Sequence, residues 1–107
     1  MKKRVKIEKS SGNVFADLGL PDSDELMLKA HLVMSIAQAI ERKGLTQTQA
    51  AARIGLKQPD VSKLLRGRFE GFSLERLLSF VRMLGTDVEI KFKPSKPKQE
   101  GRILMLA

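Results

Sequence analysis

The segment at residues 52–67, ARIGLKQPDVSKLLRG, constrains the fold of this chain more than any other. Two short helical patterns meet there with Gly55 between them, and Pro59 falls just inside the second pattern. Glycine adopts a positive φ without a Cβ clash, so Gly55 allows the chain to turn sharply between two helices. Proline costs little in a first helical turn, because the N–H that it lacks would have no partner there. The segment therefore predicts a helix-turn-helix.

Helical periodicity and capping signals extend this prediction over the middle of the chain. Apolar residues recur at spacings of three and four from Leu26 to Ile40. Asp22 with Glu25, and Thr46 with Gln49, have the spacing of a capping box. We expect helices over residues 23–43, 47–54, 57 or 58–65, and 74–84.

The hydrophobic period changes from helical to alternating after Gly85. Val88, Ile90 and Phe92 alternate with charged residues, which predicts a half-buried β-strand, and the ending RILMLA is expected to pair back on it. A lone hairpin is marginally stable in water. We therefore expect the apolar side chains of Val88, Ile90 and Phe92 to form a dimer interface across a two-fold axis. Packing of this strand on the chain's own helices is the alternative.

Composition excludes several classes of protein. The 107 residues suit one domain with a modest core. With no cysteine and one histidine, we expect neither a metal site nor a cofactor, and no constellation of side chains suggests an enzyme or a small-molecule substrate. No apolar run approaches the roughly 20 residues that span a bilayer. We expect a cytoplasmic protein without a membrane partner.

Positive charge is concentrated on the central motif. The formal net charge of the chain is +8, and residues 46–68 contribute half of it. Their charged residues are Arg53, Lys57, Lys63, Arg66 and Arg68 against Asp60 alone. A local excess of this kind favours a polyanion such as nucleic acid. A basic surface that only keeps the protein soluble is the alternative.

The side chains that the third helix leaves outside the core are polar or basic. An α-helix fits the DNA major groove, and the second helix of such a motif presents its N-terminal residues there. Gln58 can pair with adenine, Lys63 can donate to guanine or phosphate, and Asp60 can accept from cytosine or cap the helix. A phosphate suits the free N–H groups at the start of the preceding helix. The predicted DNA contacts are Thr46, Gln47, Lys57, Gln58, Pro59, Asp60, Ser62, Lys63, Arg66 and Arg68.

These residues also carry a family resemblance. LTQTQAAARIGLKQPDVSKLLRG resembles the helix-turn-helix of Cro/CI-type (XRE) repressors in its T-Q opening, its I-G-L turn and its V-S-x-L-L-x-G recognition helix. The flanks, GNVFADLGLPDSDELMLKA and FSLERLLSFVRMLGTDVEIKFKP with the GRI ending, are similar to HigA-type antitoxins of bacterial toxin–antitoxin operons. The resemblance covers about residues 12–107. Pro59 departs from the repressor pattern, so base readout is expected to depend on Gln58 and Lys63.

The resemblance implies a mainly α fold, a Cro/CI-like bundle of four to five helices with a short C-terminal β-strand or hairpin used in dimerisation. It implies a homodimer that represses its own operon at a palindromic operator and binds a RelE/HigB-like toxin, in a bacterial cytoplasm and associated with the nucleoid. The expected domains are a basic, partly flexible arm (1–21), the DNA-binding domain (22–85) and the dimerisation hairpin (86–107).

A toxin-binding surface is predicted from apolar residues outside the main helical stripe, because methionines and a flexible apolar segment pack adaptively against a partner. These residues are Val14, Phe15, Leu18, Leu20, Met27 and Met34. Closing one side of the core would account for them equally well. Two alternatives to an autoregulating antitoxin stay open. One is a phage-type or XRE regulator without a toxin, and the other is an inhibitor module that mainly sequesters a toxin.

Overall fold

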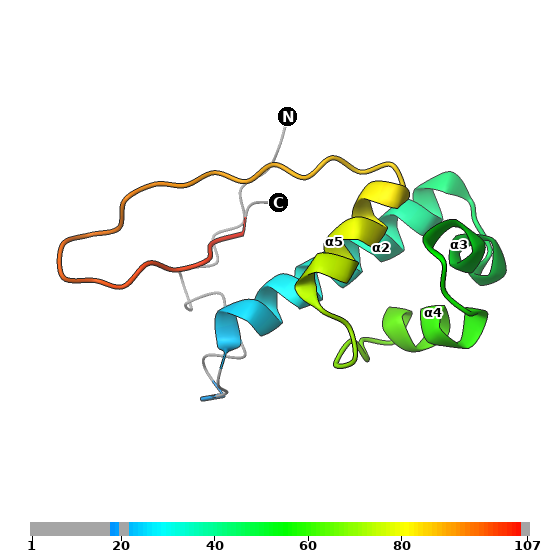
Figure 1. The fold of residues 1–107 in the computed structure, drawn as a ribbon, viewed down its shortest axis with the longest axis horizontal. Helices are drawn as coiled ribbons and strands as arrows, with labels where there is room; N and C mark the ends of the chain where they lie inside the picture. Colours follow the sequence, from blue (N-terminus) through cyan, green and yellow to red (C-terminus); the bar gives the residue numbers. More distant parts are fainter. Residues whose placement is uncertain (1–17, 20–21, 106–107) are drawn as a thin grey trace. The chain divides into compact units, whose positions relative to one another are not determined.

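The computed structural model describes residues 18–19 and 22–105. Its helices are α2 (Ser23–Lys43), α3 (Gln47–Ile54), α4 (Gln58–Leu65) and α5 (Leu74–Met83) (Figure 1). The four helices predicted from the sequence are thus confirmed, with the last one ending a residue earlier than expected. The chain divides into two compact units, Lys29–Glu89 and Met1–Leu28 with Ile90–Ala107.

The helical unit, Lys29–Glu89, is built around one apolar core to which all four helices contribute. Its largest fully buried side chains are Ile36, Val61, Leu64, Leu77, Val81 and Leu84. Burying a leucine, isoleucine or valine side chain contributes about 1.5–3 kcal/mol relative to leaving it in water. The apolar periodicity of the sequence therefore accounts for the packing of this unit.

The junction between α3 and α4 has the geometry that the sequence predicts. Gly55 has a φ of +75°, in the left-handed region. The carbonyl of Ala51 accepts hydrogen bonds from the N–H groups of both Gly55 and Leu56, the second at 3.0 Å. Ala50 and Ala51 are buried, and their small side chains leave room for α4 to approach. A helix end, a turn and a close helix contact thus meet within a few residues.

Of the two capping boxes predicted from the sequence, the one at the start of α3 is present and the one at the start of α2 differs. The capping box of α3 is present, because the Thr46 hydroxyl accepts from the Gln49 N–H at 3.1 Å and the Gln49 side chain accepts from the Thr46 N–H at 2.9 Å. Asp22 instead has a φ of +53°. This is the left-handed region, which aspartate tolerates, and an N-cap residue is typically extended.

The predicted C-terminal β-strand or hairpin is wrong for the part of the chain that the structure describes, because residues 86–105 contain neither helix nor strand. The part of this segment in the second unit, residues 90–105, forms two extended legs joined by a turn (Figure 1). The turn is closed by hydrogen bonds from the Gln99 N–H to the Lys96 carbonyl (3.1 Å) and from the Ser95 hydroxyl to the Gln99 carbonyl (2.8 Å). Pro94 and Pro97 remove two backbone donors, and two legs alone are marginal as a sheet.

The return leg has one further contact within its unit. The N–H of Ile103 donates to the Asp24 carboxylate in the first turn of α2 at 3.0 Å. A charge-assisted hydrogen bond of this kind is stronger than a neutral one. The segment is therefore tied to the start of α2 although it has no regular secondary structure.

We predict that Gly55→Ala lowers the free energy of unfolding by about 1 kcal/mol, because a Cβ is strained at positive φ. A Cβ at residue 55 would meet nothing within 4 Å, so the cost is conformational and not steric. The measurement is urea denaturation followed by circular dichroism. Gly71→Ala is the control, since a Cβ there also meets open space and no left-handed φ is required. Equal stability of the two variants would contradict the assigned turn geometry.

We also predict a pH dependence that arises from His31 on α2. Burial lowers the pKa of His31 below its ordinary value of 6.5. The unfolded chain therefore takes up a proton at His31 at a higher pH than the folded chain does. The free energy of unfolding is unaffected by this group above about pH 6.5, and it decreases as the pH falls from there towards the lower pKa of the folded state. Denaturation at a series of pH values should show a smaller loss of stability on acidification in His31→Gln. Identical pH profiles would contradict this prediction.

Candidate nucleic-acid interface

The outer side of α4 is fixed by the way that the helix packs. Val61 and Leu64 are fully buried, so the rotation of α4 about its axis is determined by the core. The opposite side then has to face outward. Of the predicted DNA contacts on and around this helix, Lys57, Gln58, Pro59, Lys63, Arg66 and Arg68 are exposed, and Asp60 and Ser62 are half-buried.

The start of α3 is a backbone site that is suited to an anion. The capping box uses the Thr46 hydroxyl and the Gln49 N–H. An α-helix leaves its first N–H groups without internal partners, and here those of Gln47 and Thr48 lie directly after the cap. These donors and the positive end of the helix dipole favour a phosphate.

A side-chain hydrogen bond joins the starts of the two short helices. The amide nitrogen of Gln58 donates to the amide oxygen of Gln47 at 2.6 Å. Gln58 is the first residue of α4 and Gln47 is the first residue of α3. The bond holds the Gln58 amide in one orientation and leaves its second N–H and its oxygen for another partner. The predicted contacts Gln47 and Gln58 are therefore brought together in space.

The remaining predicted residues of α4 fall into two groups. The guanidinium of Arg66 donates to the Ser62 hydroxyl at 3.1 Å, so these two side chains contact each other. Lys57 precedes the helix and makes no side-chain cap, and Asp60 lies in the first turn, where the helix dipole favours an acidic group. Asp60 therefore suits helix stabilisation as well as contact with a base.

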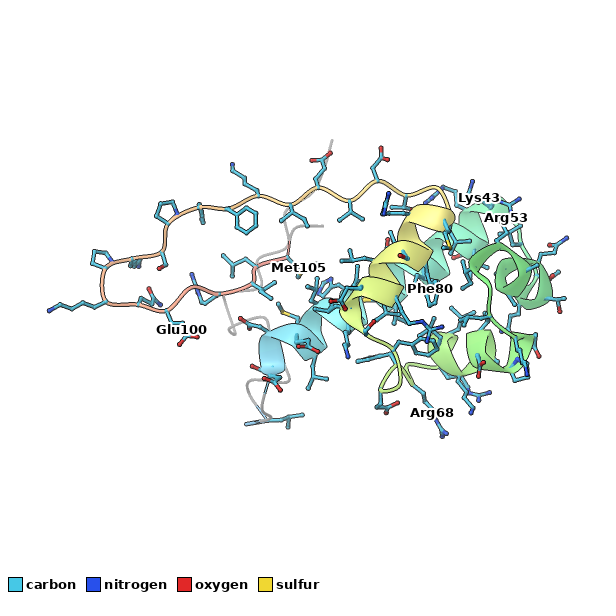
Figure 2. The ribbon with its side chains drawn as sticks, viewed as in Figure 1. Lys43, Arg53, Arg68, Phe80, Glu100 and Met105 are labelled. Carbon is cyan, nitrogen blue, oxygen red and sulfur yellow. The ribbon has the colours of Figure 1, made fainter. Side chains whose placement is uncertain are left out.

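A surface hollow of about 440 Å³ adjoins α4 within the helical unit. Its lining residues are Leu56, Asp60, Lys63, Arg68, Glu70, Gly71, Phe72 and Arg76. In Figure 2 the Arg68 side chain extends outward from the loop that follows α4. Three cations against two carboxylates give this hollow a positive balance. A backbone phosphate is a ligand of suitable charge for it.

Arg76 is the lining residue that the sequence reasoning missed. Its guanidinium lies 5.0 Å from the ring centroid of Phe72 and 5.5 Å from that of Phe80, at cation–π distances. The two rings meet edge to face at 6.0 Å, and Phe80 points inward from α5 (Figure 2). Arg76 and Phe80 are four residues apart on α5, and this spacing is the sequence signal that places them on one face of the helix. Phe72 lies just before the N-cap Ser73, so helical spacing does not predict its position.

The residues predicted to form the dimer interface are exposed. Phe92 is 90% exposed, Ile90 69% and Val88 38%, so all three are available to a partner. Among the predicted toxin contacts, Leu18 is 69% exposed and Met34 56%, whereas Met27 is buried and is not accessible to a partner in this conformation. Val14, Phe15 and Leu20 lie outside the described residues.

Met34 lies at an apolar hollow of about 360 Å³, which it lines together with Ala30, Val33, Ala37, Leu65, Arg66, Gly67 and Phe69. No helix in the described ranges is long and apolar enough to cross a membrane. The same ranges contain no group of three or more histidine, cysteine, aspartate or glutamate residues that could hold a metal ion.

Comparisons with known proteins agree with this geometry. A family model described as a helix-turn-helix domain matches residues 14–93. Among solved structures, one named "Putative XRE Family Transcriptional Regulator" has 39% sequence identity with this chain and a TM-score of 0.72. The match covers 81% of this chain and 99% of that one. None of the curated proteins matches the chain.

Proposed function

This chain belongs to the family of XRE-type helix-turn-helix transcriptional regulators, which bind DNA, and we propose that it represses transcription as a homodimer at a palindromic operator. The single observation that carries the proposal is the hydrogen bond between Gln47 and Gln58. It fixes an exposed amide at the N-terminal end of α4, which is the part of such a helix that reaches base edges.

Gln58 reads adenine in this proposal. Its second amide N–H donates to adenine N7, and its amide oxygen accepts from adenine N6, while the first N–H stays bound to Gln47. Because the Gln47 bond restricts the rotamer of Gln58 before DNA arrives, less side-chain entropy is lost on binding.

Backbone phosphates supply most of the affinity. We assign this role to the first N–H groups of α3 and to the cations around α4, which are Lys57, Lys63, Arg66, Arg68 and Arg76. Arg66 exchanges its bond with Ser62 for a phosphate, and Lys63 donates either to guanine or to the backbone. These contacts position the protein and carry no sequence information of their own.

Pairing of two copies across a two-fold axis in the C-terminal segment would join two α4 helices in one dimer. The exposure of Val88, Ile90 and Phe92 supports this, because alternating apolar residues on an extended chain suit pairing with a second copy. Successive major grooves on one face of B-DNA are about 34–36 Å apart, so such a dimer requires a palindrome with that spacing.

An antitoxin role is the finer part of the proposal. It is supported by the resemblance of the flanks to HigA-type antitoxins and by Met34, an exposed and adaptable side chain at an apolar hollow. A toxin of the RelE/HigB type is the expected partner. Co-expression with the neighbouring reading frame distinguishes the antitoxin from a regulator that has no toxin, since only the antitoxin forms a stable complex with the product of that frame.

We predict that Gln58→Ala weakens binding to an operator selected from randomised duplexes by about 5- to 150-fold and relaxes specificity at one base pair. Gln47→Ala should cause a smaller loss, because Gln47 orients the amide without touching the base. Fluorescence anisotropy with labelled duplexes measures both. Gln38→Ala, an exposed glutamine on α2, is the matched control. If Gln58→Ala binds the operator like this control, the assigned reading residue is wrong.

We predict that the wild-type protein sediments at twice the 12.0 kDa mass of the chain and that Phe92→Lys sediments as a monomer. A lysine in the apolar face buries an unpaired charge in the dimer. Glu89→Lys is the control, since residue 89 points to the opposite side of the extended segment and should leave the dimer intact. A wild-type monomer, or dimers in both variants, would contradict the proposed interface.

A further inference from the structure

The C-terminal segment carries a concentration of charge that the helix-turn-helix does not use. Residues 93–102, which we name the basic arm, have the sequence KPSKPKQEGR and are all exposed. Their charged residues are Lys93, Lys96, Lys98 and Arg102 against Glu100. A chain segment with four cations and one carboxylate favours a dense polyanion.

The basic arm is a constrained loop and not a free tail. Hydrogen bonds among Ser95, Lys96 and Gln99 close its turn, and Ile103, just after it, is held by Asp24. Pro94 and Pro97 restrict the backbone further. The turn already fixes the backbone conformation around Lys96 and Lys98. Binding a partner through these lysines therefore costs less conformational entropy than ordering a flexible tail would.

We propose that the basic arm is a second DNA-binding surface that contacts backbone phosphates outside the bases read by α4. Duplex DNA presents about one negative charge per 1.7 Å of its axis, which makes it a strong polyanionic partner for such a loop. Lysine ammonium groups contact phosphate as point charges, so the arm adds affinity without reading sequence. The inference rests on the proposed function only for the identity of its partner.

The test compares two variants of the full-length chain that each lose two exposed cations. Lys96→Gln with Lys98→Gln neutralises the turn of the arm, and Lys43→Gln with Arg82→Gln removes two cations from α2 and α5. Affinities for the operator duplex and for a random duplex are measured over a series of salt concentrations. Circular dichroism shows that each variant is folded.

We expect the slope of log affinity against log salt to decrease in magnitude by about 1.8 per bound chain in the arm variant and to change little in the control. The affinity of the arm variant should fall by the same factor for both duplexes, so the ratio of operator affinity to random-duplex affinity stays constant. Equal slopes in the two variants would overturn the proposal, as would a loss confined to the operator. If the wild type shows no preference for any operator, the proposed function fails, while the slope on random duplex still tests the arm.

Discussion

The contact between α3 and α4 across Gly55 is the constraint on which the rest of this structure depends. The left-handed glycine ends α3 and returns the chain at once, and the small buried Ala50 and Ala51 let α4 pack closely. Because Val61 and Leu64 are fully buried in the core, the outer side of α4 is determined by that packing. The position of the proposed DNA-reading surface on α4 thus follows from how the core is packed.

Two kinds of side chain have different roles in the proposed DNA binding. Gln58 is held by Gln47 before any ligand arrives, which suits a group that must discriminate between bases. The lysines and arginines around it are long and exposed, which suits groups that follow a phosphate backbone without reading it. Arg76 is an intermediate case, because two phenylalanine rings hold a cation that has no base to read.

The sequence predicts the local features of this fold. It misses the features that depend on segments that are distant in the sequence. The glycine turn and the capping box at Thr46 are encoded within a few residues, so both are confirmed. The bond between Gln47 and Gln58 joins residues eleven positions apart, and only the turn geometry brings them together. The C-terminal strand fails because alternation shows which side chains share a face but does not supply the neighbouring strand that would pair with them.

The most direct test of the central claim is to replace each adenine of the operator in turn with 7-deazaadenine, which lacks the N7 acceptor, and to measure the affinity of wild type and Gln58→Ala. Replacement of at least one adenine should weaken binding by the wild type by about 1–3 kcal/mol and should have no further effect on Gln58→Ala, because the two changes remove the same contact. Equal losses in both proteins at every adenine, or no loss in the wild type, would contradict the assignment of Gln58 to adenine.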